Sequence, residues 1–253
     1  MAADGDIPGP TEEDPMTQLP VGAVATAVVT STTTSTAVVG TSANTVWTAV
    51  SARKIADRAA LLAQRPDWQL EGPLPADDVL DVSQVPTSQL SAREREIVDQ
   101  DATSLVAALR ERRYSAFEVA EAFCRVATAA QALTNCLTEV FFGEALQRAA
   151  ELDRHLHETG EVVGPLHGLP VSIKDHILVQ GHDTATGYAA WAYRTKATKD
   201  AVAVDILRRA GAVLYVKTAN PQTLLVGFSF LFFRSRRLFF FLFSSFTMRP
   251  SSD

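Results

Sequence analysis

The sequence predicts an α/β protein, and two observations carry this prediction. A helical pattern is followed by a short apolar strand twice, first at residues 134–140 and again at residues 212–216. The helices between the strands carry their own start and stop residues. Alternation of this kind is typical of a mostly parallel or mixed sheet covered by helices. With 253 residues and 47% hydrophobic content, the chain is long enough to bury a core.

The first 50 residues are expected to be a disordered, low-complexity extension. Residues 1–20 are rich in Pro, Gly, Asp and Glu. Residues 21–50 consist mainly of Thr, Val, Ala and Ser, with no turn residues that would fix a strand register. A cleaved targeting segment is the alternative, but the arginines of such peptides are missing. A folded domain is therefore expected over residues 51–226.

Helix starts are marked by capping residues. "SARE" (Ser91 to Glu94) and "SAFE" (Ser115 to Glu118) have the spacing of capping boxes. Asp101 is placed to cap the helix between them, which is expected to run to about Arg113. Behind the second box, apolar residues recur at helical spacing and predict one buried face: Phe117, Ala120, Phe123 and Ala127.

Two strands and two further helices follow. "TNCLTEV" (residues 134–140) has the composition of a short strand, and the next helical pattern is expected to end at Gly160. Later, Asp200 is expected to cap a helix that Gly211 ends, and the apolar run Ala212 to Val216 is predicted to be a strand.

The segment "GPLHGLPVSIKD" (residues 164–175) is the main candidate for chemistry. Because side chains alternate along a strand, Ser172 and Lys174 share one face, opposite Val171 and Ile173. Burial lowers the pKa of a lysine, and a neutral lysine can accept a proton from a hydroxyl. The simpler interpretation is a solvated ion pair between Lys174 and Asp175. Local features alone favour that interpretation.

Several blocks in order resemble the N-terminal half of the amidase signature family: "GPLHGLPVSIKD", "DTATGY" (residues 183–188) and "KDAVAVDILRRAGAVLYVKTANPQTL" (residues 199–224). Three more resemble its fungal general amidase, acetamidase-like branch: "PDWQL" (66–70), "LTNCLTEV" (133–140) and "GYAAW" (187–191). The resemblance covers roughly residues 51–225.

The resemblance implies an α/β/α fold around a large mixed sheet and hydrolysis of the C–N bond of small carboxamides. Family members use a serine nucleophile, a bridging serine and a lysine, and the lysine corresponds to Lys174. It would accept a proton through the bridging serine and help to return one to the leaving nitrogen. No cofactor and no metal are expected. The expected partner is a small amide substrate, and a homodimer is one option for full-length members.

The family's Gly/Ser-rich loop, which supplies both serines and the oxyanion hole, is expected after "KTANPQT" but is not found there. The last glycine is Gly227, and the serines beyond it lie among Phe and Arg: Ser229, Ser235, Ser244 and Ser245. We therefore expect the nucleophile and the bridging serine to be missing, and the chain to be a truncated, inactive form. Ala219 also stands where the family commonly has Asn, which weakens the case for a role of Asn220.

Residues 227–253 form a Phe/Ser/Arg-rich tail outside the family pattern. Nine of the thirteen Phe residues lie between Phe228 and Phe246. Phe, Ser and Leu share pyrimidine-rich codons, so translation through a non-coding stretch would give this composition. A basic amphipathic membrane anchor is the alternative. The central arginines of the tail leave no uncharged run long enough to span a bilayer.

Other candidate sites are weaker. Ser172 could be a nucleophile for Lys174, but no oxyanion donors accompany it. His176 and His182, beside Asp175 and Asp183, match no standard zinc spacing and are expected to lie in loops. A helix-end role is expected for His155 and His157, and a core position for Cys124.

Charge and cysteine content limit the class of protein. The net charge of −6 argues against a nucleic-acid binder. Two cysteines are too few for a disulfide framework, and the N-terminus lacks the basic region of a secretory signal. A cytoplasmic location is expected. Two alternatives to a stand-alone amidase stay open. One is a protein like the amidase-type component of the aminoacyl-tRNA amidotransferases, and the other is a non-enzymatic fragment with a membrane or interaction tail.

Overall fold

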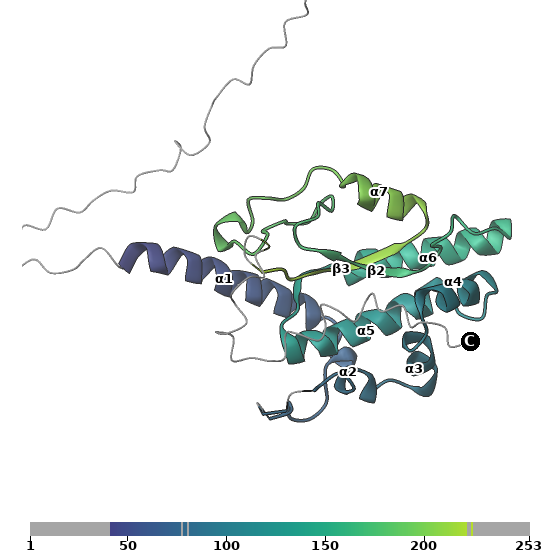
Figure 1. The fold of residues 1–253 in the computed structure, drawn as a ribbon, viewed down its shortest axis with the longest axis horizontal. Helices are drawn as coiled ribbons and strands as arrows, with labels where there is room; N and C mark the ends of the chain where they lie inside the picture. The colour runs from purple at the N-terminus through teal and green to yellow at the C-terminus, as the bar shows by residue number, and fades with distance from the viewer. Residues whose placement is uncertain (1–40, 77, 80, 222–223, 225–253) are drawn as a thin grey trace, which may run out of the picture. The chain divides into compact units, whose positions relative to one another are not determined.

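The computed structural model describes residues 41–76, 78–79, 81–221 and 224 of the chain, with side chains from residue 46 onward. Figure 1 shows the arrangement of these residues. In chain order, the elements are α1 (Thr41–Leu62), η2 (Pro66–Trp68), α2 (Val85–Ser88), α3 (Ala92–Val98), α4 (Ala102–Arg110), α5 (Ala116–Thr134), β1 (Leu137–Val140), α6 (Phe142–Thr159), β2 (Pro170–Lys174), η3 (Ala189–Trp191), α7 (Val202–Arg209) and β3 (Val213–Thr218).

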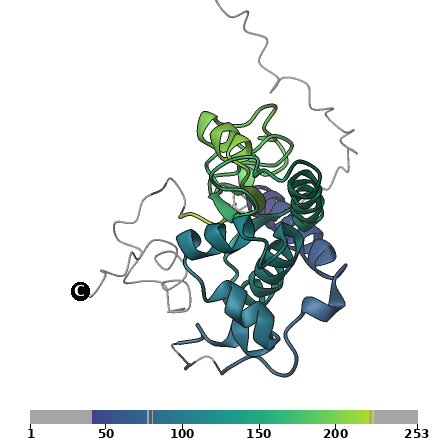
Figure 2. The same cartoon turned by 90° about the vertical axis from the view of Figure 1, so that its right-hand side faces the viewer.

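The described strands form a small mixed sheet in the order β1-β3-β2. β3 pairs antiparallel with β1 and parallel with β2. Helix α7 lies on one side of the strands and helices α3–α5 on the other, as Figures 1 and 2 show from two directions. The predicted α/β class with a mixed sheet is thereby confirmed.

Each face of the sheet has its own hydrophobic cluster. Against α7, the buried side chains include Ile173 of β2, Val204 of α7 and Leu214 of β3. On the opposite face, Val213 packs among buried residues of α4, α5 and α6. A third cluster joins Trp68 and Val216 to the end of α5 and to β1. The two faces of β3 are thus both buried, as expected for a central strand covered by helices.

A β-bulge interrupts β3 and decides which way its last residues face. Val171 is paired with Leu214 and Ile173 with Lys217, so one residue of β2 lies opposite two residues of β3, Tyr215 and Val216. An extra residue in one strand shifts the alternation of every side chain beyond it. Lys217 therefore shares the face of Ile173, and Lys174 lies on the other face, beside Thr218.

Most of the predicted helix ends are confirmed. The Ser91 side chain and Glu94 form the full capping box of α3, and Asp101 accepts a hydrogen bond from the Ser104 N–H at the start of α4. Gly160 ends α6 at a φ of 77°. Gly211, with a φ of 92°, follows α7.

The start of α5 differs from the predicted capping box. Ser115 does accept from the Glu118 N–H, but the Glu118 carboxylate pairs with Arg93 of α3 instead of turning back to the cap. Asp153 of α6 accepts hydrogen bonds from the N–H groups of Ala116 and Phe117, at 2.6 and 2.9 Å. A tertiary acceptor thus satisfies N–H groups that the local motif leaves open.

Two further predictions about helices were wrong. Phe117 is 39% exposed, because α5 turns Ala116, Val119 and Ala120 toward the core. Asp200 does not cap α7, which begins after Ala201 without a side-chain cap. The Asp200 carboxylate accepts instead from the Gln180 N–H and from Arg208.

The predicted boundary at residue 50 was also wrong, because α1 begins at Thr41 and continues to Leu62. Tertiary contacts explain this helix. Lys54 pairs with Glu139 of β1, and Arg58 donates to the carbonyl of Leu137 at 2.6 Å. Both contacts are made by residues after position 50, and the helix extends from them back through the low-complexity stretch to Thr41. The boundary at residue 226 and the Phe/Ser/Arg-rich tail lie outside the described residues, as does most of the predicted extension.

Candidate active site

Lys174 is the last residue of β2, and its amine is held at a defined position. Its Nζ donates a hydrogen bond to the backbone carbonyl of Ala219, at 2.7 Å, just beyond the end of β3. The side chain is half-buried. The predicted strand therefore places the lysine at the carboxyl ends of two parallel strands, where α/β proteins commonly bind ligands.

Burial changes the proton affinity of this amine. Desolvation lowers the pKa of Lys174 below its ordinary value, while the neighbouring Cys136 and Asp175 act in the opposite direction. A lowered pKa increases the fraction of neutral lysine at a given pH, and only the neutral amine can accept a proton. The solvated ion pair considered from sequence does not describe this geometry.

Cys136 is linked to the same backbone residue, Ala219, that accepts the hydrogen bond from Lys174. Its backbone carbonyl accepts a hydrogen bond from the Ala219 N–H at 2.8 Å, so the backbone of Ala219 bonds to Cys136 through its N–H and to Lys174 through its carbonyl. The thiol is buried, and desolvation raises its pKa. A thiol that keeps its proton is a poor nucleophile. Cys136 is therefore poorly suited to act as a nucleophile beside the lysine.

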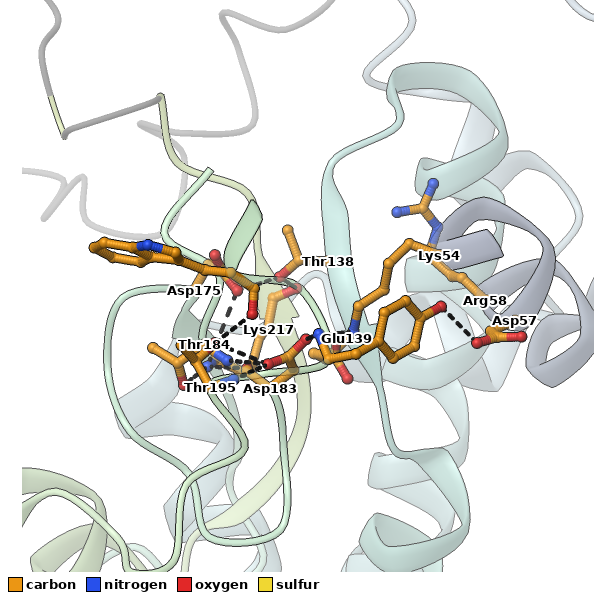
Figure 3. A network of polar contacts seen from close by, with 12 residues as sticks. Lys54, Asp57, Arg58, Thr138, Glu139, Asp175, Asp183, Thr184, Thr195 and Lys217 are labelled. Carbon is orange, nitrogen blue, oxygen red and sulfur yellow. Dashed lines mark hydrogen bonds and ion pairs between the residues drawn. The ribbon is translucent and has the colours of Figure 1, made fainter. Parts of the chain in front are cut away.

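On the opposite face of the sheet, a second lysine, Lys217, is fully buried. Figure 3 draws its polar contacts. Lys217 Nζ donates to the carbonyl of Asp183 at 2.7 Å and to the Thr184 hydroxyl at 2.8 Å, and it lies 4.0 Å from Oδ1 of Asp175. Desolvation lowers its pKa. Lys217 therefore joins the end of β3 to the residue that directly follows Lys174.

Asp183 organises the loop that covers this second lysine (Figure 3). Its carboxylate accepts hydrogen bonds from the N–H of Tyr193 and the hydroxyl of Thr195, and it lies 3.0 Å from Nζ of Lys54. Two residues of the loop, Thr186 and Tyr193, have positive φ values of 52° and 67°. The carboxylate thus supports a backbone conformation that L-residues rarely adopt.

A separate hollow of about 240 Å³ lies between α1 and β1. Lys174 is not among the residues that line it; these include Lys54, Arg58, Glu139 and Asp183. Most of these charges already have partners in the ion pairs that dock α1. The charged residues of this hollow therefore serve to dock α1. The hollow is distinct from the site around Lys174.

The weaker sequence candidates do not join the lysine. Ser172 is exposed on β2, and His176 is exposed in the loop that follows. His182 stacks on Phe141, with ring centroids 4.2 Å apart, and its Nε2 lies 3.1 Å from Glu144. Among the described residues, no group of three or more His, Cys, Asp or Glu side chains could hold a metal ion.

Several other sequence predictions concern the core, a helix end and the tail. Cys124 is fully buried, as expected. His157 lies in the last turn of α6, also as expected. Asn220 donates only to the carbonyl of Pro221, and its Oδ1 has no hydrogen-bond partner among the described residues. The four tail serines lie outside the described residues. No helix in the described part of the chain has the length and apolar character needed to cross a membrane.

Sequence reasoning missed Lys217 and the roles of Asp175 and Asp183. One signal was present: Lys217 is one of only five lysines, and it follows an apolar strand just as Lys174 does. Its burial depends on the bulge in β3, which the sequence does not announce. The contact with Asp183 also joins residues 34 positions apart.

Comparison with known proteins places this site in a family. The family profile described as Amidase matches residues 118–229, which include β2, Lys174 and β3. The acetamidase of Emericella nidulans is 43% identical over 173 residues, covering 68% of this chain and 31% of that protein. An amidase of Gibberella moniliformis is 45% identical over 142 residues, covering 56% of this chain and 27% of that protein.

A solved structure gives the same result for the fold. The structure of a fatty acid amide hydrolase matches with a TM-score of 0.62 at 32% identity, over 72% of this chain and 33% of that one. The chain has a mixed sheet with a half-buried lysine at the end of a parallel strand. Together with the family profile and the matching fold, these features define an amidase-type domain. The chain belongs to the amidase signature family, in its fungal-type branch. It spans about a third of the length of the curated relatives that it matches.

Proposed function

We propose that this chain carries the lysine-bearing part of an amide-hydrolysing site of the acetamidase type, with Lys174 as the proton acceptor. The observation that carries the proposal is the half-buried amine of Lys174, fixed at 2.7 Å from the carbonyl of Ala219. The similarity to an acetamidase supports small carboxamides as the substrate class.

The proton transfers follow from the state of the amine. A neutral Lys174 would take a proton, through a bridging serine, from the serine hydroxyl that attacks the amide carbon. The resulting ammonium would then return a proton to the leaving nitrogen. The carbonyl of Ala219 accepts one N–H of the amine in either protonation state, so it holds Nζ in place throughout. Desolvation favours the neutral state from which the cycle begins.

We further propose that the 253-residue polypeptide has no amidase activity by itself. Hydrolysis needs a nucleophile and oxyanion donors as well as a base. No Gly/Ser-rich segment follows Thr218 in the sequence, and the last glycine is Gly227. The purified polypeptide should therefore release no ammonia from acetamide or benzamide. Turnover that is lost in Lys174→Ala would contradict this part of the proposal.

The role of the lysine needs a protein that holds the remaining groups. We would join residues 41–221, which include the whole of α1, to the C-terminal part of the Emericella nidulans acetamidase and measure acetamide hydrolysis. Replacing Lys174 by Ala in this chimera should lower kcat by about a hundred-fold or more, because general acid–base groups commonly contribute that much. Lys199→Ala, at an exposed lysine, should leave kcat unchanged. A folded chimera in which Lys174→Ala retains full activity would overturn the assignment.

A further inference from the structure

Asp175, which directly follows Lys174, forms a buried charged pair with Lys217. Asp175 is 1% exposed and Lys217 is fully buried. Oδ1 of Asp175 accepts from the Thr138 hydroxyl at 2.9 Å and lies 4.0 Å from Nζ of Lys217. Its Oδ2 has no hydrogen-bond partner among the described residues. A buried carboxylate in this position depends on nearby positive charge for its stability.

Two lysines are available to this carboxylate, one on each face of the sheet. Lys174 precedes Asp175 directly, and the Asp175 N–H donates to the carbonyl of Thr218 at 2.9 Å, which fixes the peptide between the two residues. The bulge in β3 turns Lys217 to the face opposite Lys174. The negative charge of Asp175 therefore acts on the amines of both lysines.

Few ionisable groups among the described residues act on each lysine. Cys136 and Asp175 act on Lys174. Asp175, Glu139, Asp183 and Lys54 act on Lys217. Lys54 is itself paired with Glu139 and Asp183. Asp175 is thus the acidic group that acts on both lysines.

We propose that Asp175 and Lys217 form a positioning pair that sets how readily Lys174 releases its proton. The Asp175 carboxylate favours the ammonium form of Lys174, and Lys217 opposes this effect because it neutralises the same carboxylate. Neither residue touches a reacting atom in this scheme. The catalytic meaning of the pair rests on the proposed function, but its effect on the amine is a property of this chain and can be measured without turnover.

The test is competitive acetylation of the full 253-residue chain with a trace of acetic anhydride over a series of pH values. The protein is then unfolded and fully acetylated with isotopically heavy reagent, and mass spectrometry gives the reactivity of Lys174. The pH of half-maximal reactivity should fall in Asp175→Asn, with several-fold faster labelling near neutral pH. It should rise in Lys217→Gln, whose amide can still donate to Asp183 and Thr184. The double variant should lie between the two.

These signs separate charge from loosening of the structure. A variant that merely exposes Lys174 to water would move its half-reaction pH upward, toward the ordinary lysine value, so a fall in Asp175→Asn cannot come from loosening. Lys199→Gln, at an exposed lysine, is the matched control and should leave Lys174 unchanged. Circular dichroism melts identify the folded variants.

An unchanged or raised half-reaction pH in folded Asp175→Asn would overturn the proposal. If Lys217→Gln fails to fold, Asp175→Asn alone decides the outcome. An inactive chimera with the expected labelling shifts would contradict the proposed function and leave the pair standing. An active chimera without those shifts would support the proposed function and contradict the role of the pair.

Discussion

Nζ of Lys54 lies 3.0 Å from Oδ2 of Asp183, and this ion pair joins helix α1 to the loop that covers Lys217. The two residues are far apart in sequence, yet both side chains are largely shielded from water. Lys54 also pairs with Glu139 of β1. One lysine thus fastens the first helix to both the sheet and the loop beside the candidate site.

Replacing Lys54 by Met should weaken the docking of α1. The change leaves Glu139 and Asp183 without their cation, and loss of one partner of a shielded ion pair costs about 1–3 kcal/mol of unfolding free energy. Urea denaturation would measure the loss, and limited proteolysis should cut within α1 sooner. Lys199→Met, at an exposed lysine, should change neither; equal losses in the two variants would contradict the role of Lys54.

Asp183 should make stability depend on acid pH. Burial opposes its ionisation, but hydrogen bonds from Tyr193, Lys54 and Thr195 outweigh this effect and lower its pKa below the ordinary 3.8. A carboxylate with a lowered pKa contributes stability above 3.8 that is lost as the pH falls through the folded-state value. In Asp183→Asn, the unfolding free energy should be lower at neutral pH and fall less steeply in acid. Urea titrations at several pH values would test this, and parallel curves for both proteins would refute it.

Asp153 should stabilise α5 from outside that helix. Its carboxylate accepts from the N–H groups of Ala116 and Phe117, so Asp153→Ala should cost about 1–2 kcal/mol, as the loss of a helix cap does. Glu158→Ala, on an exposed position of the same helix, is the control. Thermal melts would compare the two. A loss in Asp153→Ala no larger than in the control would show that Ser115 alone suffices.

Gly211 should tolerate a methyl group far less well than Gly160. Both have positive φ values, 92° and 77°. A Cβ on Gly211 would lie 2.8 Å from Cα of His167, whereas nothing lies within 4 Å of one on Gly160. Gly160→Ala should therefore cost about 1–2 kcal/mol from backbone strain alone, and Gly211→Ala should add about 1–3 kcal/mol for the clash. Chemical denaturation would measure both, and equal losses would show that the His167 segment moves aside.

Local features of the fold could be predicted from sequence because they depend on neighbouring residues. Ser91, Asp101 and Gly160 act within one turn of their own helices, and each was assigned correctly. The strand that ends at Lys174 was also expected. Asp200 is also a residue type that commonly caps helices, but its carboxylate accepts hydrogen bonds from Arg208 and from the Gln180 N–H instead. A capping motif predicts well only where no tertiary partner competes for its side chain.

The family blocks, the α/β class and the lysine at the end of β2 could all be read from the amino-acid sequence. The surroundings of that lysine could not, because they depend on how the chain folds. The bulge at Tyr215 and Val216 turns Lys217 to the opposite face, and the fold brings Asp183 and Thr184 to its amine. A buried charge needs partners from distant segments, and only the folded chain determines which segments supply them.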